Sequence, residues 1–256
     1  MTRAGIYLDS LLGATLPDGS RVQVVAPPAV RETVVLAIRK HVAADRTLGD
    51  YAGDGSFDGL RTGKVALNSD APVRRIDPAN AAAFLAEAVR ERRNILIAGG
   101  TSTGKTTFLG ALLREIPPAE RLILIEDTPE LELTHANSIG LLAARSELSE
   151  TDLSAEDLLM AALRMRPDRI ILGELRGREA FTFLRSVNTG HPGSMTTIHA
   201  DSPQRAVEQL ALLVLQSGAQ LRWEDVLQYV RASIDVYVQL EREGGRRKVS
   251  ALMVRG

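Results

Sequence analysis

The sequence predicts an α/β protein whose main domain is built on a mostly parallel β-sheet. Between residues 94 and 218, short apolar segments alternate with segments in which apolar residues recur at helical spacing. Continuous apolar strands indicate a parallel sheet that is covered by helices on both faces. The expected strands are 95–98, 122–125, 169–173 and 194–198, and the expected helices are 106–115, 158–165, 178–187 and 203–218.

The two ends of the chain depart from this alternation. Near the C-terminus, residues 234–240 and 249–254 flank a Gly-Gly turn at 244–245, a pattern typical of a β-hairpin. Near the N-terminus, residues 21–25 and 34–38 are rich in β-branched side chains, which favour strands. The chain therefore carries a second, smaller α/β domain before the main one.

A segment rich in glycine and aspartate separates these two parts. It shows no sustained apolar periodicity and is interpreted as a linker. Asp77 followed by Pro78 then predicts the start of a helix. The sequence thus predicts an N-terminal domain over 1–45, a linker over 46–76 and the main domain over 77–256.

Composition excludes several classes of protein. The 256 residues include no cysteine, which excludes disulfides and thiolate metal sites. The net charge of −1 provides no basic field, so no direct, sequence-specific binding of nucleic acid is expected. There is no apolar run of about 18 residues, and the N-terminus lacks the apolar core of a signal peptide. We therefore expect a soluble, cytoplasmic protein.

The turn after the strand at 95–98 matches the phosphate-binding consensus G-x-x-x-x-G-K-[ST] in full. Glycines let consecutive backbone N–H groups point at phosphate oxygens, and the following helix N-terminus adds partial positive charge. Lys105 can reach the β- and γ-phosphates, and the Thr106 hydroxyl can bind Mg²⁺. The sequence therefore predicts binding of ATP with Mg²⁺. The expected nucleotide-binding residues are Gly99, Gly100, Thr101, Ser102, Thr103, Gly104, Lys105, Thr106 and Thr107.

Acidic residues follow two more of the predicted strands. Glu126 and Asp127 come directly after one strand, and Glu174 follows another. Ligands of open parallel sheets bind outside the carboxyl ends of the strands. ATP hydrolysis needs a carboxylate near Mg²⁺ and another that positions the attacking water. Glu174 suits the second role, and Glu126 or Asp127 suits the first.

Two of the four histidines, His191 and His199, flank the predicted strand at 194–198. A ring N–H can donate to a γ-phosphate or to a catalytic carboxylate, which makes them candidate phosphate sensors. Their pattern alone favours structural capping instead.

Five arginines crowd around the strand that precedes Glu174. For any single one of them, a salt bridge to a nearby acid is the favoured interpretation. One of them acting on phosphate across a subunit boundary is the alternative. They are Arg164, Arg166, Arg169, Arg176 and Arg178.

The order of these motifs resembles that of the secretion-superfamily ATPases, and within them the traffic ATPases of type IV secretion and conjugal DNA-transfer systems. The similarity covers most of the chain, from about residue 8 to residue 240. The motifs that carry it are 99–106, 125–130, 164–176, 190–194 and 197–200.

This resemblance implies a RecA-like core with a small N-terminal domain, assembled as a homohexameric ring. Such a motor lies at the cytoplasmic face of the inner membrane, contacts secretion-channel proteins, and uses ATP hydrolysis for pilus assembly and for transfer of DNA or protein. In the family's roles, Glu174 is the general base and Glu126 lies in an acidic box. His191 and His199 lie in a histidine box, and Arg39 approaches the nucleotide from the N-terminal domain.

The chain departs from the family pattern in a shorter N-terminal domain and in Gly177, where relatives often carry Asp. Three alternatives stay open. The first is a type IV pilus or type II secretion ATPase of the same superfamily, although the sequence lacks the four-cysteine module typical of the type II form. The second is a scaffold that binds ATP without hydrolysing it. A nucleic-acid motor is a third interpretation, which the near-neutral charge disfavours.

Overall fold

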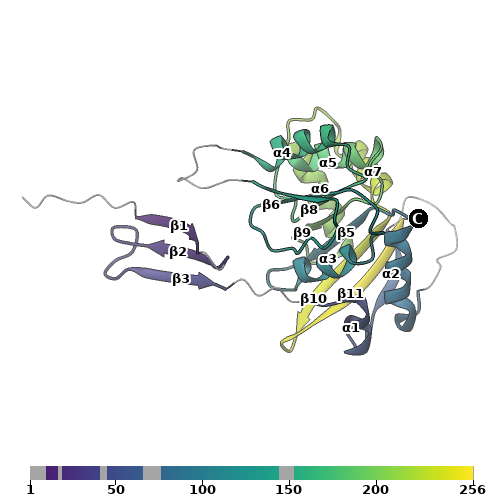
Figure 1. Cartoon of the computed structure of the whole chain (residues 1–256), viewed down its shortest axis with the longest axis horizontal. Coiled ribbons are helices and arrows are strands. Elements are labelled where there is room, and N and C mark those ends of the chain that lie inside the picture. The colour runs from purple at the N-terminus through teal and green to yellow at the C-terminus, as the bar shows by residue number, and fades with distance from the viewer. Residues whose placement is uncertain (1–9, 17–18, 41–44, 66–75, 144–152, 256) are drawn as a thin grey trace, which may run out of the picture. The chain divides into compact units, whose positions relative to one another are not determined.

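A computed structural model describes residues 10–16, 19–40, 45–65, 76–143 and 153–255 (Figure 1). The described residues divide into two compact units, one that ends at residue 40 and one that begins at residue 45. Each unit is built around its own sheet.

The N-terminal unit is a three-stranded antiparallel sheet, β1(Leu11–Thr15), β2(Arg21–Val25) and β3(Val35–Arg39), in the order β1-β2-β3. Both strands expected from the sequence are present, the second one shifted by one residue. The described part of this unit contains no helix, whereas an α/β domain was expected. Large apolar side chains are exposed on it, with Leu36 at 58% and Ile38 at 53%.

The second unit contains an eight-stranded sheet in the order β4-β11-β10-β5-β9-β8-β6-β7. All neighbouring strands are parallel except the β10–β11 hairpin. The strands are β4(Arg61–Val65), β5(Ile95–Gly99), β6(Leu122–Glu126), β7(Ser138–Leu142), β8(Arg169–Leu172), β9(Met195–Ile198), β10(Val236–Glu243) and β11(Arg246–Arg255). The predicted α/β class with a mostly parallel sheet is confirmed.

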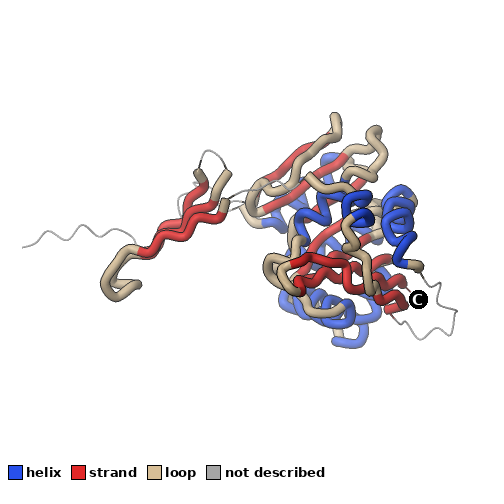
Figure 2. Tube along the Cα trace, turned by 90° about the horizontal axis from the view of Figure 1, so that it is seen from below, coloured by secondary structure: helices blue, strands red, loops and turns tan. Residues whose placement is uncertain are grey.

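Helices cover both faces of this sheet (Figure 2). In β5, Ile95 and Ile97 belong to one apolar core and Leu96 and Ala98 to the other. Because both faces of the strand are buried, its sequence is apolar throughout. The helices are α1(Leu48–Gly53), α2(Ala81–Arg90), α3(Lys105–Leu113), α4(Ala155–Ala162), α5(Glu179–Asn188), α6(Pro203–Gln216) and α7(Trp223–Ser233). Short 3₁₀ turns, Pro78–Asn80 and Leu163–Met165, adjoin α2 and α4.

The predicted helix starts are formed by the expected capping chemistry. Asp77 accepts a hydrogen bond from the backbone N–H of Ala79, next to Pro78. Ser154 and Asp157 form a reciprocal capping box at the start of α4. These local signals therefore locate both helices in the sequence to within a few residues.

The segment expected as a linker, 46–76, is instead largely folded into the second unit. Thr47 and Asp50 form a capping box at the start of α1, and Tyr51 is buried against Phe108 of α3 with its ring edge-on. β4 then pairs with the end of β11. The sequence did not predict this helix, because α1 has only six residues, too few to show helical periodicity, and lies in a glycine-rich segment. Residues 66–75 of the expected linker lie outside the described residues.

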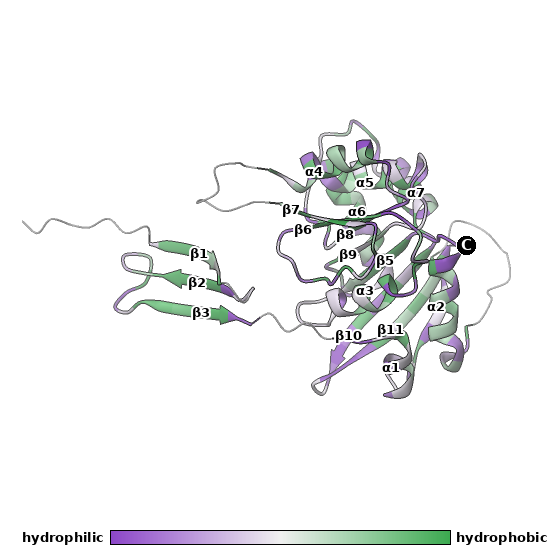
Figure 3. Ribbon diagram, in the orientation of Figure 1, coloured by the Kyte–Doolittle hydropathy of each residue, from purple (hydrophilic) through white to green (hydrophobic). Residues whose placement is uncertain are grey.

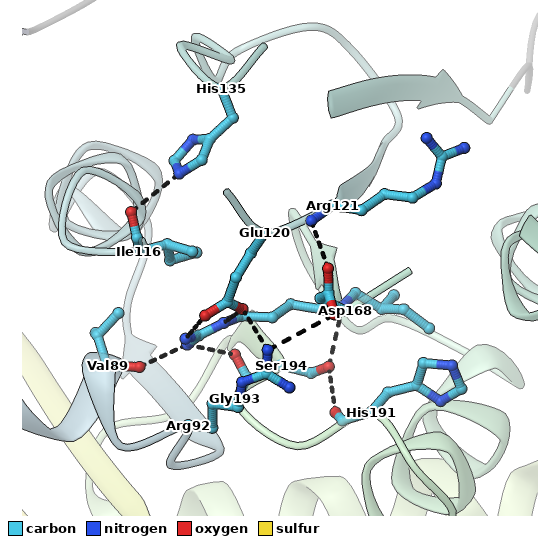
Figure 4. Close-up of polar contacts among 12 residues, drawn as sticks. Val89, Arg92, Ile116, Glu120, Arg121, His135, Asp168, His191, Gly193 and Ser194 are labelled. Carbon is cyan, nitrogen blue, oxygen red and sulfur yellow. Dashed lines mark hydrogen bonds and ion pairs between the residues drawn. The ribbon is translucent and has the colours of Figure 1, made fainter. Parts of the chain in front are cut away.

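A buried ion pair supports the amino edge of the sheet (Figure 4). Arg169, at the start of β8, is fully buried and binds Glu120 through two parallel contacts of 2.6 and 2.9 Å. Its Nη1 donates to the carbonyl of Val89 at 2.6 Å, and Arg92 adds a second cation at 3.3 Å from Glu120. At Gly193 a Cβ atom would lie 2.8 Å from Nη1 of Arg169, so only glycine fits beside this pair.

The buried pair predicts a large loss of stability when its acid is neutralised. Glu120→Gln leaves the Arg169 charge buried without a full partner, and we expect the free energy of unfolding to fall by roughly 3–5 kcal/mol. Glu115→Gln is the matched control, because its partner Arg90 is exposed and such pairs contribute about 0–1 kcal/mol. Denaturant unfolding measures both, and equal small losses in the two variants would contradict the assignment.

Candidate functional site

Four strands of the sheet end in register at one edge. Ala98 of β5 lies beside Ile198 of β9, and Leu172 of β8 lies beside both Thr196 of β9 and Ile125 of β6. The residues that follow these strands therefore emerge together. They are the glycine-rich loop after β5, Glu126 at the end of β6 with Asp127 after it, Glu174 after β8, and His199 after β9.

Residues 99–104, which run from the last residue of β5 to the start of α3, have the compact form expected of a phosphate-binding loop, or P-loop. Gly104 has φ = 93°, and Ser102 is also left-handed at 61°. The Thr103 hydroxyl donates to the carbonyl of Gly100 at 2.9 Å. A Cβ atom at Gly99 would lie 2.5 Å from that hydroxyl and 2.9 Å from the carbonyl of Leu240. The loop therefore requires glycine at both ends.

Lys105 begins α3 and turns back over the P-loop. The residue is only 8% exposed, and its ammonium donates to the carbonyls of Gly99 at 3.0 Å and Gly100 at 3.1 Å. Nδ1 of His199 lies 3.3 Å from the same nitrogen. Burial lowers the pKa of Lys105; the charge of Arg176 lowers it further, and that of Glu174 opposes the change. The cation is thus held by neutral acceptors that an incoming phosphate can replace.

His199 connects this lysine to Glu174. Its Nε2 lies 2.7 Å from Oε1 of Glu174, a close contact in which the ring N–H is not aimed squarely at the oxygen. Because the Lys105 ammonium can only donate, Nδ1 of His199 accepts, and the proton of the neutral ring lies on Nε2, facing the carboxylate. Lysine, histidine and glutamate therefore form one continuous polar chain.

Arg176 holds two of the predicted carboxylates. Its Nη2 lies 2.8 Å from Oε2 of Glu174, and its Nη1 lies 2.9 Å from Oδ2 of Asp127. The hydrogen bond to Glu174, which outweighs the opposing effect of burial, raises the pKa of Arg176 above its ordinary value. Arg176 was one of the five arginines in the sequence, and the salt-bridge interpretation of it is the one the contacts support.

Glu126 lies at the same edge but supports the backbone of its own loop. It is 7% exposed, and its Oε1 accepts hydrogen bonds from the N–H groups of Glu130 and Leu131, both at 3.1 Å. A Cβ atom at Gly173 would lie 3.2 Å from Cγ of Glu126, so this glycine leaves room for the carboxylate. These contacts order the loop that carries Asp127.

His191 does not share this site within the chain. It precedes β9, whereas His199 follows that strand, so the two histidines lie at opposite edges of the sheet. Its carbonyl accepts from the Ser194 hydroxyl at 2.8 Å, and that hydroxyl accepts from the N–H of Ile170 at 3.1 Å (Figure 4). Within the chain, His191 therefore has no place beside the P-loop. Its contact to Ser194 is made by the backbone, so a capping role of the ring stays a prediction.

The remaining predicted residues occupy separate positions. Thr106 and Thr107 lie in the first turn of α3, half-buried. Arg39 ends β3 in the N-terminal unit, and its role toward a nucleotide stays a prediction.

Sequence reasoning missed Gln239, whose Nε2 donates to the carbonyl of Ala200 at 3.1 Å, directly after His199. A single polar residue within the apolar segment 236–240 was the available signal. Gln239 lies beside Ala98 of β5, close to the start of the P-loop.

Two kinds of feature are absent from the described residues. They contain no cluster of three or more His, Asp or Glu side chains arranged to hold a metal ion. Among the same residues, no helix is both long enough and apolar enough to cross a membrane.

Comparison with known proteins agrees with this geometry. Residues 62–243 match the model of the family described as Type II/IV secretion system protein. The type IV secretion system protein VirB11 of Bartonella quintana is 39% identical over 94% of this chain and 72% of its own length. PtlH of Bordetella pertussis, also a type IV secretion system protein, is 41% identical over 93% of this chain and 73% of its own.

Solved structures show the same likeness. The VirB11 ATPase from the Brucella suis type IV secretion system, crystallised with sulphate, matches with a TM-score of 0.64 and 37% identity over 96% of this chain and 75% of that chain. The pilus retraction motor PilT, solved with bound ADP, matches with a TM-score of 0.63 at 22% identity and supports the fold alone. The predicted RecA-like fold of the core is thereby confirmed. The chain accordingly belongs to the Type II/IV secretion system protein family, as a secretion ATPase of the type IV kind.

Proposed function

We propose that this ATPase hydrolyses Mg²⁺-bound ATP at the edge of the sheet that carries the P-loop, Glu174 and His199. The contact chain from Lys105 through His199 to Glu174 is the observation that carries the proposal. It links the group that senses the γ-phosphate to the carboxylate that positions water. The nucleotide-binding set is the predicted one, from Gly99 to Thr107.

In this mechanism, phosphate oxygens replace the carbonyls of Gly99 and Gly100 as acceptors for the Lys105 ammonium. The change at Lys105 is passed to His199, whose other ring nitrogen faces Glu174. Glu174 then orients a water molecule for in-line attack on the γ-phosphorus and accepts its proton. Arg176 keeps the carboxylate oriented until that step.

The residues present fit a nucleotide-bound Mg²⁺. This ion is usually held by one or two protein ligands, with phosphates and waters completing the octahedron. The Thr106 hydroxyl would be the direct ligand, and Asp127 or Glu126 would act through water. When bound, Mg²⁺ neutralises charge that develops on the β- and γ-phosphates.

We further propose that the chain works as a homo-oligomeric ring, of the hexameric kind that its motifs imply, at the cytoplasmic face of the inner membrane. There it would contact secretion-channel proteins and drive pilus assembly and transfer of DNA or protein. The support is the similarity to VirB11 and PtlH, both named as type IV secretion system proteins. Arg39 would then contribute to the nucleotide site from the N-terminal unit.

The division of labour between binding and catalysis is tested by two substitutions. Glu174→Gln keeps the shape of the side chain but removes the base, so we expect kcat to fall by roughly 10²–10⁴ while ADP affinity stays near wild type. Lys105→Ala removes the phosphate-binding cation, and ADP binding should weaken more than about tenfold. Phosphate release and calorimetric titration measure the two effects. Wild-type turnover by Glu174→Gln would show that Glu174 is not the base of the reaction.

The two histidines provide a second test with an internal control. His199→Ala breaks the connection between lysine and glutamate, and we expect kcat to fall about tenfold, the value of one well-placed hydrogen bond. His191→Ala, at the opposite edge, should leave kcat within about twofold of wild type. Steady-state phosphate release at saturating ATP makes the comparison. An equal loss of kcat in both variants would show that position relative to the P-loop does not govern the effect.

A further inference from the structure

The β10–β11 hairpin continues beyond the edge at which the P-loop begins. Leu240 lies beside Gly99 of β5 and opposite Val249 of β11. Arg247 pairs with Arg242, two positions further out, which places it about 7 Å beyond the level of Gly99. The outer part of the hairpin is strongly hydrophilic, in contrast to the apolar strands beneath it (Figure 3).

The side chain of Arg247 lies directly on the P-loop. A Cβ atom at Gly104 would be 3.0 Å from Cδ of Arg247, 3.7 Å from Nε and 3.9 Å from Nη1. Gly104 is the last residue before α3, where the partial positive charge of the helix and the phosphate-binding N–H groups are concentrated. A guanidinium here adds a full positive charge to a surface that is already electropositive.

The acids of the hairpin are occupied by other cations. Glu241 is paired with Arg61 at 3.4 Å, and Glu243 is paired with Lys248. The residue opposite Arg247 is Arg242, a like charge. Across the described ranges, the Arg247 guanidinium therefore has neither an ion pair nor a hydrogen bond. An arginine that is held against a P-loop without an acidic partner is available to an anion.

We propose that Arg247 is a nucleotide-binding residue and donates hydrogen bonds to the phosphate chain of the nucleotide in the P-loop. Its rigid, planar fork of N–H donors matches phosphate oxygens better than a lysine would. The proposal rests on the function proposed above, because it requires a nucleotide in that loop. It assigns the C-terminal hairpin a direct part in the site, supplied by the same chain as Lys105.

The test compares Arg247→Ala and Arg247→Lys with the control Arg246→Ala in the full chain. Arg246 is exposed on the same strand, and because successive side chains of a strand alternate, it faces the other way. Calorimetric titration with ADP and, separately, with inorganic pyrophosphate, both with Mg²⁺, measures Kd. We expect Arg247→Ala to raise Kd for both probes roughly 10- to 100-fold, Arg247→Lys to recover part of the loss, and Arg246→Ala to stay within about twofold.

Each other outcome has a distinct meaning. Unchanged Kd values in Arg247→Ala overturn the proposal, and so does a loss with ADP alone, which would indicate a contact to the base or ribose. If wild type binds ADP no better than Lys105→Ala, the proposed function itself fails. Superimposable thermal unfolding curves of the three hairpin variants show that the fold is intact.

Discussion

The parallel register of β6, β8, β9 and β5 is the constraint on which the site depends. It delivers a loop, three carboxylates and a histidine to one edge from segments that are far apart in the sequence. A shift of one residue in any of these strands would exchange its two buried faces and move its terminal residue away from the edge. Alternation of Ile95 and Ile97 with Leu96 and Ala98 between two cores fixes the register energetically.

The opposite edge of the sheet stabilises this arrangement without taking part in the chemistry. Arg169 and Glu120 connect the start of β8 to the segment before β6, and Arg169 also reaches the carbonyl of Val89 near the end of α2. A buried pair tolerates little displacement of either partner, so it fixes the position at which β8 starts. The P-loop in turn requires that the strands end at fixed positions. His191 lies at this structural edge, whereas His199 lies at the edge that carries the P-loop.

Much of the fold and part of the site could be predicted from local sequence. Strands buried on both faces, capping boxes and the P-loop are short patterns whose physical causes lie within a few residues, so they were identified close to their true bounds. α1 and β4 were missed because they depend on packing of Tyr51 and pairing with β11, which no local pattern reveals. For the same reason the sequence could list Arg176 as a candidate but could not show that it contacts Glu174 and Asp127. It also grouped His191 with His199 because they are close in the sequence, although they lie at opposite edges of the sheet.

The tautomer of His199 tests the central claim most directly, because every step from phosphate to base passes through that ring. Nitrogen-15 NMR of the imidazole, assigned with a His199→Gln variant, reports which nitrogen carries the proton. The contacts of Lys105 and Glu174 predict a neutral ring that is protonated at Nε2, with Nδ1 as acceptor. A neutral ring protonated at Nδ1 would face the lysine with a donor, and the proposed link between the P-loop and Glu174 would be contradicted.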